Sequence, residues 1–291
     1  MSASLRGTAF LGLGAMGAPM ARRVAAAMPL SVWNRTRDKA EALADVARVA
    51  STPRDAARGT GVVVTCVADA RALEVILAGP EGLLAGLEPD AVVVDMSTIG
   101  RAAAREAQRE IEAVGGHFVD APVSGSVGPA ERGELLALVG GAEPDVERAT
   151  AVLHTMCNRI LRAGAVGQGQ ALKVVLNGVG AHHFVAFASM LALGERAGLS
   201  REVLVDAFTS GAFATPSYVS KRPRVLARDY GNAEFTLALA LKDGALNLAL
   251  QEEVGLALPV AREIMREMAQ AVGEGLAQED LYAMEKYFAR R

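Results

Sequence analysis

Three glycines with the spacing G-x-G-x-x-G occur near the start of the chain, in TAFLGLGAMGAPMARRV. They follow an apolar run typical of a strand and precede an alanine-rich segment typical of a helix. In such a loop the first glycine allows a tight turn, the second lets the backbone approach a pyrophosphate, and the third lets the helix pack on the strand. A bare glycine pattern also occurs in ordinary turns, but this context predicts dinucleotide binding. The residues expected to bind are Gly12, Leu13, Gly14, Ala15, Met16 and Gly17.

The second predicted strand ends at VWNRT, where an NAD site usually has an acidic residue for the ribose hydroxyls. Asn34, Arg35 and Thr36 occupy that place, and a guanidinium with an amide and a hydroxyl can bind a 2'-phosphate. The sequence therefore predicts NADP(H) in preference to NAD(H), with NAD(H) still possible. The alternative is that Arg35 and Arg37 form only a solvated helix start.

Lys173 precedes twenty-one residues, 174–194, that carry no full charge. Lys173 and Asn177 are four residues apart and share one face of a predicted helix, with Gly180 leaving room beside them. Desolvation there would lower the pKa of the lysine and suit it to deliver a proton to a carbonyl oxygen. A lysine at the solvated start of a helix is the alternative. The flanking residues expected to be buried are Leu172, Val175, Leu176 and Val179.

The same apolar run has the length of a membrane span, but Asn177, His182, His183 and several glycines interrupt it. We therefore expect a buried helix between two domains. Adjacent histidines point apart and give no metal pair, so no metal site is expected.

Polar residues recur where the predicted parallel strands end, which is where open parallel sheets bind ligands. They include residues 66–69, residues 96–98 and the segment DAPVSGS, residues 120–126. Ser124, Gly125 and Ser126 are expected to present hydroxyl and N–H donors to a carboxylate. Alone, this segment would be read as a turn.

The elements that position these residues follow from hydrophobic patterning. The first half alternates short branched apolar runs with amphipathic alanine-rich segments, which predicts an α/β fold with a doubly wound parallel sheet. Beyond about residue 165 the pattern is helical throughout. We expect a dinucleotide-binding Rossmann domain over 1–164, and an inter-domain helix with an all-α substrate and dimerisation domain over 165–291.

Composition narrows the functional classes. The formal net charge is -3 and no stretch is densely basic, so nucleic-acid binding is not expected. Cys66 and Cys157 lack a CxxC pattern and are expected to be buried thiols. The N-terminal sequence MSASLRGTAFLGLG lacks the pattern of a secretory signal, which favours a cytoplasmic protein without a membrane segment.

The chain resembles the β-hydroxyacid dehydrogenase family over essentially its whole length, in the ordered motifs GLGAMGAPMA, DMST, DAPVSGS, GQGQALKVVLN and LKD. The resemblance implies an active site between the two domains and a homodimer or homotetramer. It implies that Lys173 is the catalytic lysine and that Asn177 orients the substrate. It also implies a carboxylate-binding loop at Ser124, Gly125 and Ser126, and a position near both nicotinamide and substrate for Thr98. It further implies cofactor contacts at Cys66, Val67 and Lys242, and substrate-binding cleft positions near the nicotinamide for Phe235 and Asp243.

Within the family, 3-hydroxyisobutyrate dehydrogenases commonly have Gly in place of Ser126 and Asn in place of Leu176. The motifs look closer to the NADPH-dependent glyoxylate and succinic semialdehyde reductases, and Lys173 argues against imine reductases. The hypothesis is hydride exchange between NADP(H) and a short β-hydroxyacid or semialdehyde acid. A non-catalytic NADP-binding scaffold or sensor is the alternative.

Overall fold

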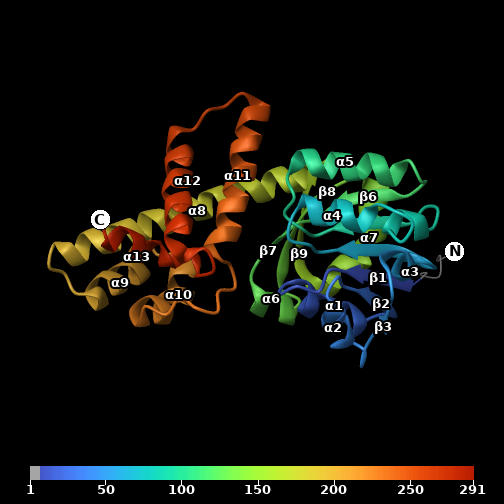
Figure 1. The fold of residues 1–291 in the computed structure, drawn as a ribbon, viewed down its shortest axis with the longest axis horizontal. Coiled ribbons are helices and arrows are strands. Elements are labelled where there is room, and N and C mark those ends of the chain that lie inside the picture. The colour runs from blue at the N-terminus through green and yellow to red at the C-terminus, as the bar shows by residue number, and fades with distance from the viewer. Residues whose placement is uncertain (1–6) are drawn as a thin grey trace. The chain divides into compact units, whose positions relative to one another are not determined.

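The computed structural model describes residues 7–291, and the first six residues of the N-terminal sequence MSASLRGTAFLGLG lie outside the described residues. The chain divides into one unit that ends at Lys173 and a second that begins at Val174 (Figure 1). The last strand of the first unit ends at Gly164. The first unit therefore includes the start of the long helix that follows.

The N-terminal unit contains a sheet with the order β3-β2-β1-β4-β5-β6-β8-β7, and β9 pairs with β8. From β3 to β6 every neighbouring pair is parallel, which is the Rossmann order and confirms the predicted fold class. The last edge is mixed, because β8 is antiparallel to β6 and β7 but parallel to β9. The strands are β1 Gly7–Leu11, β2 Leu30–Trp33, β3 Arg48–Val49, β4 Thr60–Thr65, β5 Val92–Asp95, β6 His117–Asp120, β7 Val123–Ser124, β8 Leu135–Gly140 and β9 Cys157–Gly164.

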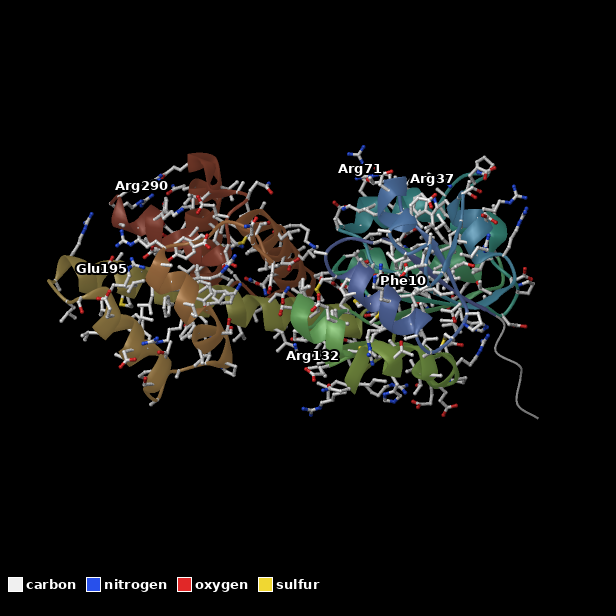
Figure 2. All side chains as sticks on the ribbon, turned by 90° about the horizontal axis from the view of Figure 1, so that it is seen from below. Phe10, Arg37, Arg71, Arg132, Glu195 and Arg290 are labelled. Carbon is white, nitrogen blue, oxygen red and sulfur yellow. The ribbon has the colours of Figure 1, made fainter. Side chains whose placement is uncertain are left out.

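Helices cover both faces of this sheet (Figure 1). Alternate residues of a strand point to opposite faces, so Phe10 lies in the core on one side while Ala9 and Leu11 lie in the core on the other. Figure 2 shows Phe10 among the side chains of this unit, and Arg37 and Arg71 at its surface. The helical segments are α1 Gly17–Ala25, α2 Arg37–Glu41, α3 Pro53–Ala57, α4 Ala70–Leu77, η1 Leu83–Gly86, α5 Arg101–Glu112, α6 Val127–Arg132 and α7 Glu143–Met156.

The second unit is helical. Its core includes an aromatic cluster in which the ring of Phe187 lies 4.7 Å from Tyr218 and 5.4 Å from Tyr282. Thr215 and Thr236 cap the starts of α10 and α11 with their side chains, as expected for threonine at a helix N-cap. The helical segments are α8 Gln168–Arg196, which begins in the first unit, α9 Arg201–Ser210, α10 Pro216–Ala227, α11 Leu237–Val254, α12 Pro259–Ala271, η2 Val272–Leu276, η3 Leu281–Ala283 and α13 Met284–Ala289.

The long helix α8 corrects one expectation. Val175 and Val179 are each 50% exposed and Leu176 is 39% exposed, whereas Val174 is buried. Within the described chain, α8 is the one helix long and apolar enough to cross a membrane by length and composition, and 28% of its most apolar window is buried. The prediction of burial was wrong for Val175, Leu176 and Val179 in the single chain, because its own elements cover only part of this apolar helix. Leu172 is half-buried.

Helix α11 begins at Leu237, after the N-cap Thr236. Phe235 therefore precedes the helix and does not lie on one of its faces. Its ring packs against the helical core instead.

Candidate active site

The glycine loop joins β1 to α1 as predicted. Gly12 has φ +98°, and a Cβ there would overlap the carbonyl oxygen of Cys66. A Cβ on Gly17 would overlap the carbonyl oxygen of Gly12, whereas a Cβ on Gly14 would meet no atom within 4 Å. The first and third glycines are thus required by the close approach of the protein's own backbone. The open position at Gly14 fits a cradle in which a pyrophosphate approaches the chain.

Asn34 has a structural role that the sequence did not reveal. Its Oδ1 accepts a 2.8 Å hydrogen bond from the N–H of Leu13, and its Nδ2 donates one of 2.8 Å to the carbonyl of Thr36. The amide therefore ties the glycine loop to the end of β2. Each end of the amide thus makes one hydrogen bond within the protein, and these bonds use only one of the two N–H groups of Nδ2.

Arg35 and Arg37 differ in their surroundings. The Arg37 guanidinium pairs with Glu41 at 2.7 Å, one turn along α2. Arg35 is exposed, and within residues 7–291 its guanidinium has no acidic partner. Arg35 is accordingly the cation at the end of β2 that can bind an added anion.

A buried carboxylate that the sequence reading missed links the ends of β4 and β5. Asp95 Oδ1 accepts hydrogen bonds from Thr65 Oγ1 at 2.8 Å and Ser97 Oγ at 2.7 Å. Ser97 Oγ in turn accepts from the N–H of Val67 at 2.8 Å. This network fixes the backbone at Cys66 and Val67, where cofactor contacts were expected. An aspartate at the end of an apolar run was the available signal.

The two cysteines are free thiols. Desolvation, with a smaller contribution from the Asp95 carboxylate, raises the pKa of Cys66 to about 12. Burial likewise raises the pKa of Cys157 to about 12. Both side chains therefore stay neutral and unreactive near neutral pH.

The segment predicted to bind a carboxylate lies at the end of β7. Gly125 has φ +135°, a conformation that L side chains rarely adopt. Ser124 is half-buried, while Gly125 and Ser126 are exposed. In the described chain neither serine hydroxyl is engaged by another protein group. These donors are thus available to a ligand.

Lys173 lies in the second turn of α8, and the first turn of this helix is anchored to the sheet. The buried carboxylate of Asp120, at the end of β6, accepts hydrogen bonds of 2.7 Å from the N–H groups of Gly167 and Gln170. The buried side chain of Gln170 binds the β5–α5 loop, which contains Thr98. The structure therefore places Lys173 on a helix held at the carboxyl edge of the sheet.

The remaining predicted residues lie in the helical unit. Asp243 is 5% exposed, and its Oδ2 accepts a 2.6 Å hydrogen bond from Nδ2 of Asn177. Its Oδ1 lies 2.9 Å from Nζ of Lys242. Asn177, Asp243 and Lys242 thus form one polar cluster on α8 and α11. Asn177 shares its helix face with Lys173, one turn earlier.

Two family models match the chain consecutively. The NAD binding domain of 6-phosphogluconate dehydrogenase matches residues 8–166, and the NAD-binding domain of NADP-dependent 3-hydroxyisobutyrate dehydrogenase matches residues 167–288. The chain belongs to the β-hydroxyacid dehydrogenase family. It is accordingly an NAD(P)-dependent oxidoreductase that acts on hydroxyacids or the corresponding carbonyl acids.

Individual relatives of this dehydrogenase agree with the assignment. The chloroplastic glyoxylate/succinic semialdehyde reductase 2 of Arabidopsis thaliana is 33% identical over 94% of this chain and 77% of its own length. The mitochondrial 3-hydroxyisobutyrate dehydrogenase of Rattus norvegicus is 34% identical over 67% of this chain and 59% of its own. The solved structure of 3-hydroxyisobutyrate dehydrogenase from Mycobacterium tuberculosis with L-serine has a TM-score of 0.86 at 29% identity, covering 97% of this chain and 99% of that one.

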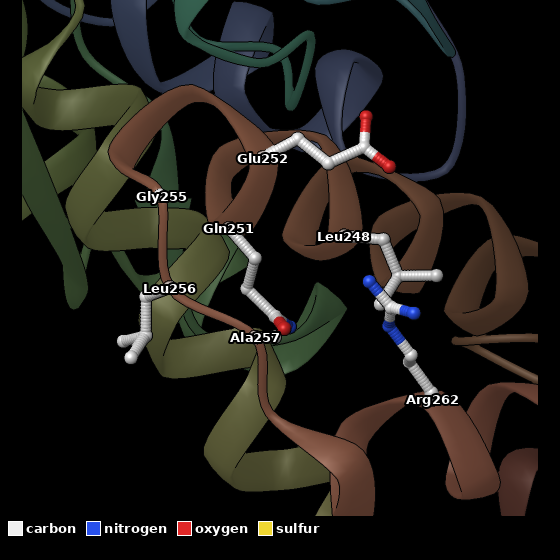
Figure 3. Close-up of a pocket in the computed structure, with 7 residues that line it drawn as sticks. All are labelled: Leu248, Gln251, Glu252, Gly255, Leu256, Ala257 and Arg262. Atoms are coloured by element: carbon white, nitrogen blue, oxygen red, sulfur yellow. The ribbon is translucent and has the colours of Figure 1, made fainter.

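A hollow of about 390 Å³ in the helical unit of the dehydrogenase is separate from these residues (Figure 3). It lies at the turn between α11 and α12 and is lined by Gln251, Glu252 and Arg262, among others. Gln251 donates to Asn247 at 2.7 Å and accepts from the N–H of Leu258 at 2.8 Å, so its amide shapes the turn. None of the predicted site residues lines this hollow.

His182 and His183 of α8 each take part in a hydrogen bond within the helical unit, His182 through its ring and His183 through its backbone carbonyl. His182 Nδ1 lies 2.7 Å from the carbonyl of Gly178, and the carbonyl of His183 accepts from the hydroxyl of Tyr218 at 2.7 Å. Over residues 7–291 there is no group of three or more His, Cys, Asp or Glu side chains arranged to hold a metal ion.

Proposed function

We propose that this dehydrogenase exchanges a hydride between NADP(H) and a short β-hydroxyacid or semialdehyde acid, with Lys173 as the proton donor or acceptor. The observation that carries the proposal is the anchoring of α8. Its first turn is hydrogen-bonded to the end of β6 and to the β5–α5 loop, at the sheet edge that also carries the glycine loop. A lysine so held is pre-organised for proton transfer.

Different groups of the chain would bind the cofactor, hold the substrate and transfer the proton. The glycine loop would hold the pyrophosphate, and the bound nicotinamide would supply the hydride chemistry. Ser124, with the backbone and hydroxyl of Ser126, would hold the substrate carboxylate. The Lys173 ammonium would donate its proton to the carbonyl oxygen during reduction and take it back from the hydroxyl during oxidation. Asn177 would hydrogen-bond the same substrate.

The proton-transfer role is tested by Lys173→Ala. We expect kcat for a semialdehyde acid to fall by about 10²-fold or more, since a positioned general acid contributes on that order. NADPH binding, measured by cofactor fluorescence, should stay near the wild-type value. Lys39→Ala, at an exposed lysine of α2, is the matched control. An active Lys173→Ala variant would contradict the assignment of Lys173 as the proton donor or acceptor.

We also propose a preference for NADP(H) that rests on Arg35. The exposed guanidinium is free of acidic neighbours, and one family model is described as NADP-dependent. Arg35→Ala should lower kcat/KM for NADPH by roughly 10- to 100-fold and leave that for NADH little changed, because a charge-assisted bond contributes about 1.5–3 kcal/mol. Arg37→Ala, where the guanidinium already pairs with Glu41, should change neither value. Equal losses with both cofactors would contradict the role of Arg35.

The substrate class rests on the Arabidopsis relative and on Ser126. The panel consists of glyoxylate, succinic semialdehyde and methylmalonate semialdehyde with NADPH, and of 3-hydroxyisobutyrate with NADP. We expect the unbranched aldehyde acids to give the higher kcat/KM. Discrimination by one methyl branch is worth about 1–3 kcal/mol, which this comparison resolves. Preference for the branched pair would assign a 3-hydroxyisobutyrate dehydrogenase.

A further inference from the structure

Gln170 is a polar side chain enclosed in the N-terminal unit, with an exposed fraction of 0%. Its Oε1 accepts hydrogen bonds from the N–H groups of Ile99 at 3.0 Å and Gly100 at 3.1 Å. Its Nε2 donates to the carbonyl of Ser97 at 2.8 Å. All three partners belong to the backbone of the β5–α5 loop, on both sides of Thr98. One amide thus joins the first turn of α8 to the loop assigned to the nicotinamide.

Asp120 forms a second anchor, and its side chain is also 0% exposed. Its two oxygens accept separately, Oδ1 from the N–H of Gly167 and Oδ2 from the N–H of Gln170, each at 2.7 Å. These N–H groups at the start of α8 have no partner within the helix. Asp120 therefore caps α8 from a strand that is remote in sequence, and the carboxylate also complements the helix dipole.

The two anchors act in different directions. Asp120 accepts from backbone N–H groups and thereby fixes the position of the first turn of α8 relative to the end of β6. Gln170 projects sideways from the helix and fixes its rotation. Lys173 follows Gln170 by three residues, so both side chains lie on adjacent positions of one helix surface. A rotation or shift of the first turn is transmitted directly to the lysine.

Simple helix stability does not require this arrangement. A buried amide and a buried carboxylate must each satisfy their hydrogen bonds at a desolvation cost, whereas apolar side chains of similar volume fill such a site without that cost. What the polar groups add is a defined geometry between a helix and a loop.

We propose that Gln170 and Asp120 are positioning residues that align Lys173 with the loop around Thr98. The inference rests on the proposed role of Lys173. Neither side chain contacts the reacting atoms in this assignment. They act by holding the proton-transferring group within the narrow range of positions from which the transfer is fast.

The test compares Gln170→Met with wild type. Methionine keeps approximately the length and volume of glutamine but removes all three loop hydrogen bonds. A displacement on the order of 1 Å can cost about 10²-fold in rate, so we expect kcat to fall by about 10- to 100-fold. KM and the dissociation constant of NADPH should change by less than about threefold. The solvent deuterium isotope effect on kcat should rise, because proton transfer becomes the slower step.

Gln168→Met is the matched control. Gln168 has the same side chain, in the same turn of α8, but it is only half-buried and lacks the bonds to the β5–α5 loop. We expect wild-type kcat and an unchanged isotope effect. If Gln170→Met does not fold, Asp120→Asn tests the second anchor, because its amide can accept only one of the two helix N–H groups.

The outcomes separate the inference from the proposed function. An inactive Lys173→Ala variant together with a fully active Gln170→Met variant would overturn the positioning role alone. Equal losses of kcat and NADPH affinity in Gln170→Met, with an unchanged isotope effect, would also overturn it, since they indicate general damage to the fold. An active Lys173→Ala variant would contradict the proposed role of Lys173, and with it the positioning role that rests on it.

Discussion

At the scale of single residues, the carboxyl edge of the sheet contains two buried aspartates. Asp95 and Asp120 occupy paired positions at the ends of the parallel strands β5 and β6. Desolvation raises the pKa of Asp120 to about 6, and the charge of Asp95 adds to the shift. The N–H groups of Gly167 and Gln170 oppose the shift by stabilising the carboxylate. The state of this carboxyl thus changes close to physiological pH.

We expect an acid limb in the pH profile of kcat with a midpoint near pH 6. Below this pH one oxygen of Asp120 carries a proton, so it no longer accepts from an N–H of α8. At one unit below the midpoint, kcat should be about tenfold lower if only the carboxylate form aligns Lys173. The asparagine variant at position 120 should lack this limb. If the acid limb persists in that variant, it arises from the titration of another group.

The pH dependence of folding stability should differ from that of kcat. The folded pKa of Asp120 lies above the ordinary value of 3.8, so its protonation favours the folded state. The stability that this group contributes is complete below about pH 4 and is lost as the pH rises through 6. Thermal melts between pH 5 and 7 should therefore show no loss from Asp120 at acidic pH, although kcat falls there.

At the scale of elements, the start of α8 is packed against the sheet with no space for an added methyl group. A Cβ on Gly169 would overlap the carbonyl oxygen of Leu138 and lie 2.7 Å from the Asp120 carboxylate. A Cβ on Gly140 would lie 2.5 Å from the same carboxylate. Gly140 and Gly169 therefore allow β6, β8 and α8 to meet.

Gly169→Ala should reduce the free energy of unfolding by about 1–3 kcal/mol, the usual cost of overpacking. Chemical denaturation of the purified variant measures the change. Gly273→Ala is the control, because a Cβ there would meet no atom within 4 Å and its φ is not positive. That variant should match or slightly exceed wild-type stability. An unchanged Gly169→Ala variant would show that α8 can move away from the sheet without cost.

At the scale of the whole molecule, α8 presents apolar side chains that the single chain leaves exposed. Leu193 is 59% exposed and Met190 is 49% exposed, in addition to the valines described above. Several large apolar side chains exposed along one long helix are typical of a protein interface. We propose that a second copy of the chain covers it, giving the homodimer or homotetramer expected from the family resemblance.

Light scattering after size-exclusion chromatography, without detergent, should give at least twice the chain mass. Leu193→Glu should shift the population towards monomer, because a buried unpaired charge is costly at an interface. Val75→Glu, at a 64% exposed valine of α4, is the control and should leave the assembly intact. A wild-type monomer would contradict the proposal, and a requirement for detergent would favour the membrane-span reading of residues 174–194.

The sequence by itself determined the elements and their order. The glycine spacing after a strand, the alternation of strand and helix in the first half and the i, i+4 pair of Lys173 and Asn177 are local patterns, and the periodicity of a helix or strand is encoded locally. The carboxyl ends of parallel strands meet at one edge, so the candidate loops could be grouped without a structure.

Only the tertiary structure decided the partners of the polar side chains. Asn34 turns its amide to the glycine loop, 21 residues away, and Gln170 reaches a loop more than 70 residues away. Val175 is exposed although its type and position favoured burial. Local pattern gives the direction in which a side chain leaves its own element. What it meets there depends on the packing of segments that are remote in sequence, and hydrogen bonds between such segments leave no periodic trace in the chain.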